Sequence, residues 1–483
     1  MKPAVEDARI SIEEVAPFRP RLAWLLWALF LLCFVTAAAA PLPAGLSRSG
    51  AYTLAALGSA LLFWASGVQD PSLTGLLVVT LLALLGVMSF ADAVAGFGTE
   101  FIWLLAATFI LTAAMAEVGL GRRIALSILH LAGGRSSRVL LALLAVMVIL
   151  SFMVPTAAGR VSMIVPVVLG IIHAAALAPP SPFAKAMLVG TSHAAIISGI
   201  GLATAAGATI YAVGAFASLA GMRWAYLAWF AAYFPLVVIF VLVLWRILLR
   251  VFPPEQPELA GGAAYIRAEL RRLGPLSTGE RKMVAAYVLI FILWIFGPRW
   301  GITTSQAATM GMLLLLLPGL RVLPWERAVE AIRWNVIILF AISLALAAAL
   351  ERSGAGAWLT DQTLSLLRRP SPGALVLVLA PLIVLVRVGF VNNLGMIAAT
   401  LPVAFTLARG WGLNQVWVGM IVVITAGPGF LLPTQTPTGM ITLGYEYYTI
   451  RDYLRSGVPA TIVLLLLTLV AALLYWPLLG YRP

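Results

Sequence analysis

Two hydrophobic segments of this chain are interrupted by polar and helix-breaking residues at corresponding places. The interruptions lie at residues 154–160 and 389–395, and each leads into an apolar stretch with a Pro-Val pair. Gly159 and Gly395 are 236 positions apart, and the same interval separates the two Pro-Val pairs. Matched interruptions in two halves of a membrane protein are typical of discontinuous helices around a site near the bilayer midplane. We therefore expect an internal repeat with a binding site between its halves.

Apolar residues dominate the remainder of the chain as well. Of 483 residues, 62% are hydrophobic and only 10% are charged, which is too little polar surface for a water-soluble protein of this length. A backbone inside a bilayer must satisfy its hydrogen bonds internally, so long apolar runs predict helices. The predicted fold class is an all-α integral membrane protein with about eleven transmembrane helices and two re-entrant hairpins, arranged as inverted repeats.

Basic residues are concentrated in the segments between the apolar runs. The net charge is +13, and such clusters set the orientation of a membrane protein and do not indicate nucleic-acid binding here. The tail at 1–22 and the linker at 253–283 are rich in basic residues, so we place both in the cytoplasm and the protein in the inner membrane. Residues 23–252 would hold scaffold helices and the first inverted repeat, and residues 284–483 the second repeat and a C-terminal helix.

Each half contains a second stretch that cannot easily form a continuous helix. Residues 198–209 are rich in glycine, alanine and threonine, and residues 432–439 contain two prolines and three threonines. Proline removes a backbone donor, and glycine costs about 1 kcal/mol in a helix interior. An unwound backbone at membrane depth is tolerated where it is buried in protein or lines a wet cavity. These stretches are expected to belong to the site, although small residues in membrane helices are often packing devices.

A helix that begins inside a membrane directs unpaired N–H groups and a partial positive charge toward the space beyond its end. Thr156 and Asn392 lie at such predicted starts, where their side chains either cap the helix or bind a ligand carboxylate. Carbonyl groups next to Asn393, Thr436 and Thr438 would offer oxygen ligands to a small cation. The pattern predicts an anion site, with a candidate sodium site at Asn393.

Arginine and histidine also occur within apolar segments near these motifs. Arg160 lies one helical turn after Thr156, where an unpaired charge costs at least about 2.5 kcal/mol, so we interpret it as a ligand of a substrate carboxylate. A structural ion pair or a snorkelling side chain are the alternatives. Arg387 poses the same question. His193 suggests a proton relay, but a buried histidine bonded to a backbone carbonyl is the preferred interpretation.

The order of these motifs resembles that of the divalent anion/sodium symporter (DASS) family, from about Trp103 to Pro459. Residues 269–282 are similar to the family's cytoplasmic linker, and residues 334–340 to the opening of its next core helix. The family's paired Ser-Asn-Thr motifs fall on residues 156–158 and 392–394, and its Thr-Pro-Pro type motifs fall near 204–209 and on 436–438. The resemblance implies that these motifs bind di- or tricarboxylates, or sulfate, together with sodium, in an elevator-type homodimer.

Three positions differ from the family pattern. Ala157 and Ala158 stand where the first motif has Asn and Thr, and Leu394 stands where the second motif has Thr. Amide and hydroxyl ligands for sodium and substrate are therefore missing, which puts sodium coupling in doubt. Arg160 coincides with an arginine of the branch that resembles bacterial citrate/succinate and plastid oxoglutarate/malate antiporters. That match favours anion exchange.

These observations predict a homodimeric secondary active transporter of small di- or tricarboxylates that works by anion exchange. Sodium-coupled symport of a carboxylate or sulfate is one alternative, and a non-transporting receptor or scaffold derived from the carrier fold is another. The sequence contains no hydrolase, phosphate-loop or zinc-protease motif, so we predict that the chain is not an enzyme and needs no cofactor beyond a candidate sodium ion. The candidate substrate-binding residues are Thr156, Arg160, Thr204, Thr209, Asn392, Asn393, Thr436, Pro437 and Thr438.

Overall fold

The computed structural model describes residues 20–366, 370–391 and 393–483. Over these residues the regular secondary structure is helical, apart from one isolated backbone bridge between Arg135 and Glu258. The prediction of an all-α fold is therefore confirmed. The predicted tail, 1–22, falls mostly outside the described residues, and Asn392 lies outside them as well.

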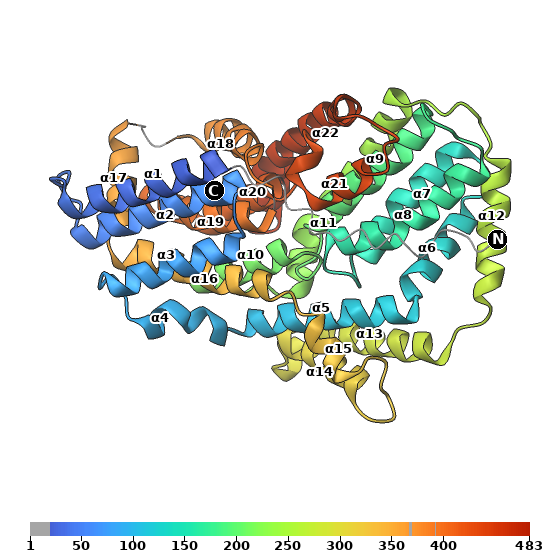
Figure 1. The fold of residues 1–483 in the computed structure, drawn as a ribbon, viewed down its shortest axis with the longest axis horizontal. Helices are drawn as coiled ribbons and strands as arrows, with labels where there is room; N and C mark the ends of the chain where they lie inside the picture. The colour runs from blue at the N-terminus through green and yellow to red at the C-terminus, as the bar shows by residue number, and fades with distance from the viewer. Residues whose placement is uncertain (1–19, 367–369, 392) are drawn as a thin grey trace.

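The helices before the predicted linker lie at both ends of the molecule, as Figure 1 shows. Helices α1 to α4 occupy one end, and α6 to α9 occupy the other (Figure 1). The elements are α1 (Pro20–Ala39), α2 (Arg48–Ser66), α3 (Pro71–Leu84), α4 (Phe90–Val94), η1 (Ala95–Gly98), α5 (Glu100–Val118), α6 (Leu120–Leu131), α7 (Ser136–Leu150), α8 (Ala157–Ala174), α9 (Pro182–Ser198), α10 (Gly207–Leu219) and α11 (Tyr226–Val251).

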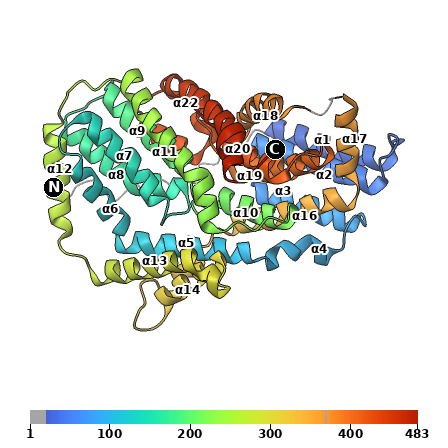
Figure 2. The ribbon, with the colours of Figure 1, turned by 180° about the vertical axis from the view of Figure 1, so that it is seen from behind.

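Several of the later elements, among them α20 and α22, lie between those two ends (Figure 1). From behind, α22 crosses beside α11, with which it packs (Figure 2). These elements are α12 (Ala260–Leu273), α13 (Thr278–Phe296), η2 (Gly297–Trp300), α14 (Thr304–Leu316), α15 (Trp325–Glu330), α16 (Trp334–Arg352), α17 (Ala355–Leu366), α18 (Pro372–Arg387), α19 (Asn393–Gly410), α20 (Gln415–Ala426), η3 (Pro433–Gln435), α21 (Pro437–Leu443), α22 (Ile450–Val470), η4 (Ala471–Tyr475) and α23 (Trp476–Leu478).

Helix length and apolar composition identify this as a multi-pass membrane protein. Within the described residues, seven helical segments are long and apolar enough to cross a bilayer, from Arg21–Ala39 to Ile450–Leu478. Six further apolar helices have only 10–17 residues. The multi-pass prediction agrees with these helices, and the number of about eleven spans stays a prediction.

Two of the short helices form hairpins with their successors. Helix α7 turns back into α8 through residues 151–156, and α18 is followed by α19 after a turn near residue 390. The second helix of each hairpin carries the matched internal proline, Pro166 in α8 and Pro402 in α19. Each hairpin is followed by a broken helix, α9 and α10 in the first half and α20 and α21 in the second.

The broken helices pack crosswise against the hairpins. Helix α21 packs against α8 and α9, which belong to the first half, whereas α10 packs against α19, which belongs to the second. Each half therefore supplies part of the wall around the other half's hairpin. A site at the breaks must be built from both halves, because neither half alone encloses it.

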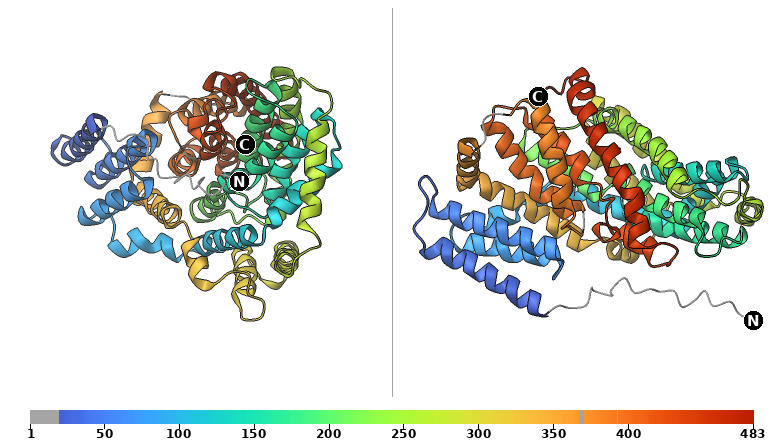
Figure 3. Two further views of the ribbon diagram at one scale, coloured as in Figure 1. Left: turned by 45° about the vertical axis from the view of Figure 1, so that its right-hand side comes forward. Right: turned by 90° about the horizontal axis from the view of Figure 1, so that it is seen from above.

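The predicted linker contains a helix that packs against the first half of the chain. Helix α12 runs along the outer edge of the molecule and packs against α6 and α8 (Figure 3). Arg122 of α6 forms an ion pair with Glu269 of α12. Arg123 bonds Glu280 at 2.6 Å and also donates to the carbonyl oxygens of Leu273 (3.0 Å) and Gly274 (2.8 Å), so it fixes the turn between α12 and α13.

Replacement of Arg123 is expected to loosen this linker. The Arg123→Ala variant leaves the carboxylate of Glu280, which is only 4% exposed, without its charged partner. We expect a loss of about 2–3 kcal/mol in the free energy of unfolding. A lower midpoint of thermal unfolding in detergent measures this loss. Arg138→Ala, at an exposed position on α7, is the matched control. Equal midpoints for the two variants would contradict the role of Arg123 in fixing the turn between α12 and α13.

Candidate functional site

A threonine caps the helix that follows a backbone break in each half of the chain. Thr156 precedes α8 in an extended conformation, and its hydroxyl oxygen accepts the N–H of Gly159 at 3.1 Å. Thr436 precedes α21 in the same conformation, and its hydroxyl accepts the N–H of Gly439 at 3.3 Å. Ala206 takes this position before α10 but has no side chain that can cap it. Both threonine caps are thus held rigidly at the ends of short loops.

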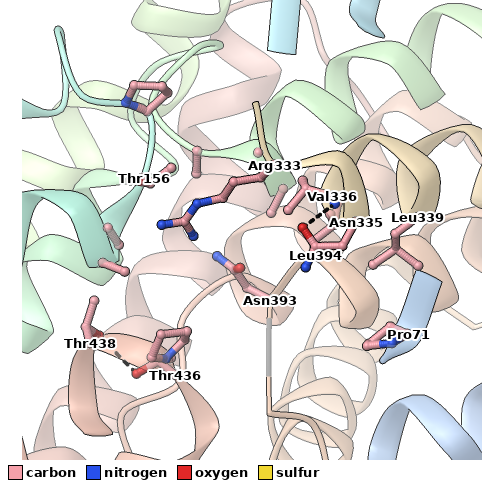
Figure 4. Close-up of a pocket in the computed structure, with 18 of the residues that line it drawn as sticks. Pro71, Thr156, Arg333, Asn335, Val336, Leu339, Asn393, Leu394, Thr436 and Thr438 are labelled. Carbon is pink, nitrogen blue, oxygen red and sulfur yellow. Dashed lines mark hydrogen bonds between the residues drawn. The ribbon is translucent and has the colours of Figure 1, made fainter. Parts of the chain in front are cut away.

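These breaks surround a cavity of about 270 Å³, shown in Figure 4. Its lining includes five of the predicted substrate residues that the structure describes: Thr156, Asn393, Thr436, Pro437 and Thr438. Arg160, Thr204 and Thr209 do not line it. The structure thus brings together residues from both halves of the chain, as the crosswise packing requires.

Several helices begin at the wall of this cavity. The lining includes residues at or beside the first turns of six helices, namely Ser72 (α3), Ala157 (α8), Gly207 (α10), Asn335 (α16), Asn393 (α19) and Pro437 (α21). The N–H groups of a first turn lack intrahelical partners, and each helix start carries partial positive charge. The cavity is therefore suited to an anion with several acceptor oxygens.

Hydroxyl groups continue from the cavity wall into the protein. The Thr436 and Thr438 hydroxyls are 3.0 Å apart, and Ser192 of α9 donates to Thr438 at 3.1 Å. His193 lies next to Ser192 and packs edge-on against Tyr453, with ring centroids 4.6 Å apart. Both ring nitrogens of His193 are buried and have no hydrogen-bond partner in the described part of the chain. The expected carbonyl partner is therefore not seen.

Arg160 lies behind the cavity and not in it. The side chain is fully buried, and its guanidinium donates to the carbonyl oxygens of Val154 (2.5 Å), Ala205 (2.9 Å) and Ala195 (2.7 Å). It also approaches the hydroxyl of Ser198 at 3.4 Å. Among the described residues it has neither a carboxylate partner nor a route to the surface, so both alternatives from the sequence also differ from what is observed.

Arg387 forms the same kind of contact in the second half. Its guanidinium donates to the carbonyl oxygens of Phe390 (2.5 Å) and Gln435 (2.7 Å). Phe390 is the repeat counterpart of Val154, 236 positions later. Gln435 and Ala205 each directly precede the N-cap of the half-helix after the break. Two arginines at unrelated places in the repeats thus bind equivalent pairs of carbonyl groups, a contact that we call the arginine clasp.

The two remaining predicted threonines support the first break from within. Thr209 donates from its hydroxyl to the carbonyl oxygen of Gly199 at 2.7 Å, which ties the start of α10 to the end of α9. Thr204 is buried in the loop between these helices. Neither threonine lines the cavity itself.

Arg333, Asn335 and Asp70 line the cavity but were not predicted from the sequence. Arg333 directly precedes α16, at the edge of an apolar segment, where an arginine is expected to mark the end of a membrane span. Asp70 caps α3 and lies far from the motifs along the chain. For Asn335 the sequence did contain a signal, because this polar residue interrupts the otherwise apolar stretch 334–340.

Residues 21–481 match the family described as the sodium:sulfate symporter transmembrane region. A membrane protein of Cupriavidus necator is 29% identical over 486 residues, covering 96% of this chain and 94% of that protein. The sodium-dependent dicarboxylate transporter SdcS of Staphylococcus saprophyticus is 28% identical and covers 94% and 91% of the two chains. SdcS of Staphylococcus aureus is 26% identical and covers 86% and 84%.

Two solved structures share the fold at low sequence identity. The YdaH transporter of Alcanivorax borkumensis gives a TM-score of 0.51 at 13% identity, with 96% of this chain and 98% of that chain covered. MtrF of Neisseria gonorrhoeae gives a TM-score of 0.56 at 13% identity, with 96% of both chains covered. These likenesses agree with a helical membrane-transporter fold.

Removal of either arginine clasp is expected to destabilise the protein. Methionine has a similar length but no donors, so each of Arg387→Met and Arg160→Met leaves two buried carbonyl groups unpaired, while the carbonyl of Ala195 keeps the hydroxyl of Ser198 as a donor. At about 1 kcal/mol or more for each unpaired group, both variants should lower the midpoint of thermal unfolding relative to wild type. Arg321→Met, at an exposed loop position, is the control. Midpoints equal to that of the control would show that the clasps contribute nothing to stability.

Proposed function

The chain belongs to the family of the sodium:sulfate symporter transmembrane region, a family of membrane transporters and not of enzymes, and on this premise we propose that it carries small dicarboxylates by anion exchange. The two arginine clasps are the observation that carries the exchange mechanism. The cavity at the helix starts supports the substrate class.

A dicarboxylate suits the cavity in charge and in size. Its acceptor oxygens match the N–H groups of the helix starts and the hydroxyls of Thr436 and Thr438. A volume of about 270 Å³ is near the lower end of ligand pockets. Two relatives from Staphylococcus are named as sodium-dependent dicarboxylate transporters, which supports the same class of substrate for this chain.

The clasps favour a mechanism without sodium. Carbonyl oxygens in an unwound membrane segment are the groups that a small cation would coordinate. Here the guanidinium groups of Arg160 and Arg387 hold the carbonyls of Val154 and Phe390, at the tips of both hairpins. A guanidinium supplies a permanent positive charge that no ion needs to bring. We therefore assign to these side chains the role of bound cations.

The same charges favour anion exchange over net uptake, in which the carrier would have to return across the membrane without a bound anion. Among the described residues, neither clasp has a carboxylate partner, so two positive charges lie buried behind the cavity wall. Moving uncompensated charge through the apolar middle of a membrane is unfavourable, whereas a bound dianion would neutralise it. The loaded carrier should therefore change its orientation more easily than the empty one.

Sodium-coupled symport of a carboxylate or sulfate is the second candidate. The names of the Staphylococcus relatives favour it, and the side chain of Asn393, our candidate sodium ligand, lines the cavity. The homodimer, the elevator motion, the inner-membrane location and the cytoplasmic N-terminus are further parts of the proposal. Their support is the family membership and the distribution of basic residues.

Uptake into proteoliposomes tests the mechanism. Labelled succinate, citrate and sulfate are supplied outside, with or without internal anion, in sodium or choline buffer. We expect succinate uptake that requires internal anion and is equal in both buffers. Uptake driven by a sodium gradient into anion-free vesicles would establish symport instead. Specific succinate binding without uptake in any arm would favour a receptor.

Thermal stability offers a second test that needs no transport. A ligand at one hundred times its Kd stabilises the folded state by about 2.7 kcal/mol. If the arginine clasps take the place of sodium, replacing choline by sodium should leave the midpoint of unfolding unchanged, whereas succinate should raise it. Potassium is the control for ionic strength. A rise that is specific to sodium would contradict the proposed role of the clasps.

A further inference from the structure

Arg333 is directed into the cavity from the wall opposite the threonine caps. Figure 4 shows its guanidinium extending into the space between Thr156 and Asn393. The side chain belongs to the lining of the cavity. Within the described chain, its guanidinium donates no hydrogen bond and forms no ion pair. Its donors are therefore available to a ligand.

The acidic residue on the same wall does not neutralise this arginine. Asp70 caps α3, where one of its carboxylate oxygens accepts the N–H of Ser72 at 2.8 Å and the Ser72 hydroxyl at 2.5 Å. Its other oxygen lies 3.5 Å from the amide nitrogen of Asn335. Asn335 in turn accepts the N–H of Val336 at 2.9 Å. The polar groups around Arg333 thus serve the starts of α3 and α16.

The other two arginines near the cavity differ from Arg333 in this respect. Arg160 and Arg387 are buried, neither lines the cavity, and their terminal guanidinium nitrogens donate to backbone carbonyls. Only their buried Nε atoms have no partner among the described residues, so both side chains offer charge but no accessible N–H group to a substrate. Arg333 is exposed at its position before α16. It is the one of these three guanidinium groups that can contact a substrate directly.

We propose that Arg333 binds one carboxylate of the substrate and thereby makes the site select dianions over monoanions. The inference rests on the proposed function and adds a residue to it. A guanidinium presents paired N–H donors that match the two oxygens of a carboxylate. The second carboxylate lies across the cavity, at the start of α8 and beside Thr436 and Thr438. The two ends of a short dicarboxylate are thus recognised by different groups of helices.

The position of Arg333 makes this role testable by substitution. Helix α16 packs mainly against α3 and η1, and the exposed Arg333 side chain holds no other described group in place. A neutral replacement therefore leaves no buried group unpaired, and the variant should fold. Arg321, exposed between α14 and α15 and absent from the cavity lining, offers a matched control.

The experiment compares succinate with succinamate, in which a neutral amide replaces one carboxylate. Dissociation constants of both are measured for wild type, Arg333→Gln, Arg333→Lys and Arg321→Gln in lipid nanodiscs. We expect wild type and Arg321→Gln to prefer succinate by about 10- to 100-fold, the range for a hydrogen bond to a charged group. In Arg333→Gln this preference should fall toward unity. Arg333→Lys, which keeps the charge without the paired donors, should retain part of it.

The outcomes separate this inference from the proposal on which it rests. If wild type binds succinate and Arg333→Gln keeps the full preference over succinamate, Arg333 is not the carboxylate ligand, while the proposed transport function stands. An equal loss of affinity for both compounds would show a structural effect and would also overturn the inference. If wild type binds none of succinate, malate, citrate and sulfate, the proposed substrate class fails, and this role of Arg333 fails with it.

Discussion

Backbone carbonyl groups lose their helical hydrogen bonds where helices break inside the membrane, and other donors must replace those bonds. The arrangement of the site in this protein follows from which donors do so. Lipid offers no hydrogen bonds, so an unpaired carbonyl there costs several kcal/mol. In this protein the guanidinium groups of Arg160 and Arg387 supply the donors, one at each hairpin tip. They join the hairpin turn to the following broken helix. The position of the cavity between those elements follows from this bond pattern.

The arrangement of the breaks explains why the cavity favours anions. The N-termini of several helices that begin inside the protein line the same cavity. Each N-terminus carries partial positive charge. The crosswise packing of α10 on α19 and of α21 on α8 brings starts from both halves together. Buried arginines behind the wall add full charges. An anion is thus attracted by backbone, threonine and arginine groups at once.

Three arginines near one cavity have different surroundings and, in our proposal, different tasks. Arg160 and Arg387 are buried, bind backbone carbonyls through their terminal nitrogens and act as fixed cations, while Arg333 has free donors and faces the substrate. This division separates the charge balance of the carrier from the choice of substrate. The first concerns which ion, if any, accompanies transport, and the second concerns which anion is carried.

The class of the protein and the sites of the backbone breaks could be predicted from the amino-acid sequence alone. Apolar content and the prolines and glycines in matched places are local signals, so Thr156, Asn393, Thr436 and Thr438 were predicted at the cavity that they line. The task of Arg160 could not be read in this way. Whether a buried arginine meets a carboxylate, a carbonyl or a ligand depends on residues such as Ala195 and Ala205, which lie far along the chain.

Only the tertiary structure decided that Arg333 faces the cavity and that Thr209 supports the wall instead of lining it. In the sequence, Arg333 resembles any basic residue that flanks a membrane span. Its position opposite Thr156 arises because α16 packs against α3 while α8 packs against α21. Hydrophobic pattern and helix breakers are properties of neighbouring residues, whereas the partner of a side chain is set by contacts between distant segments.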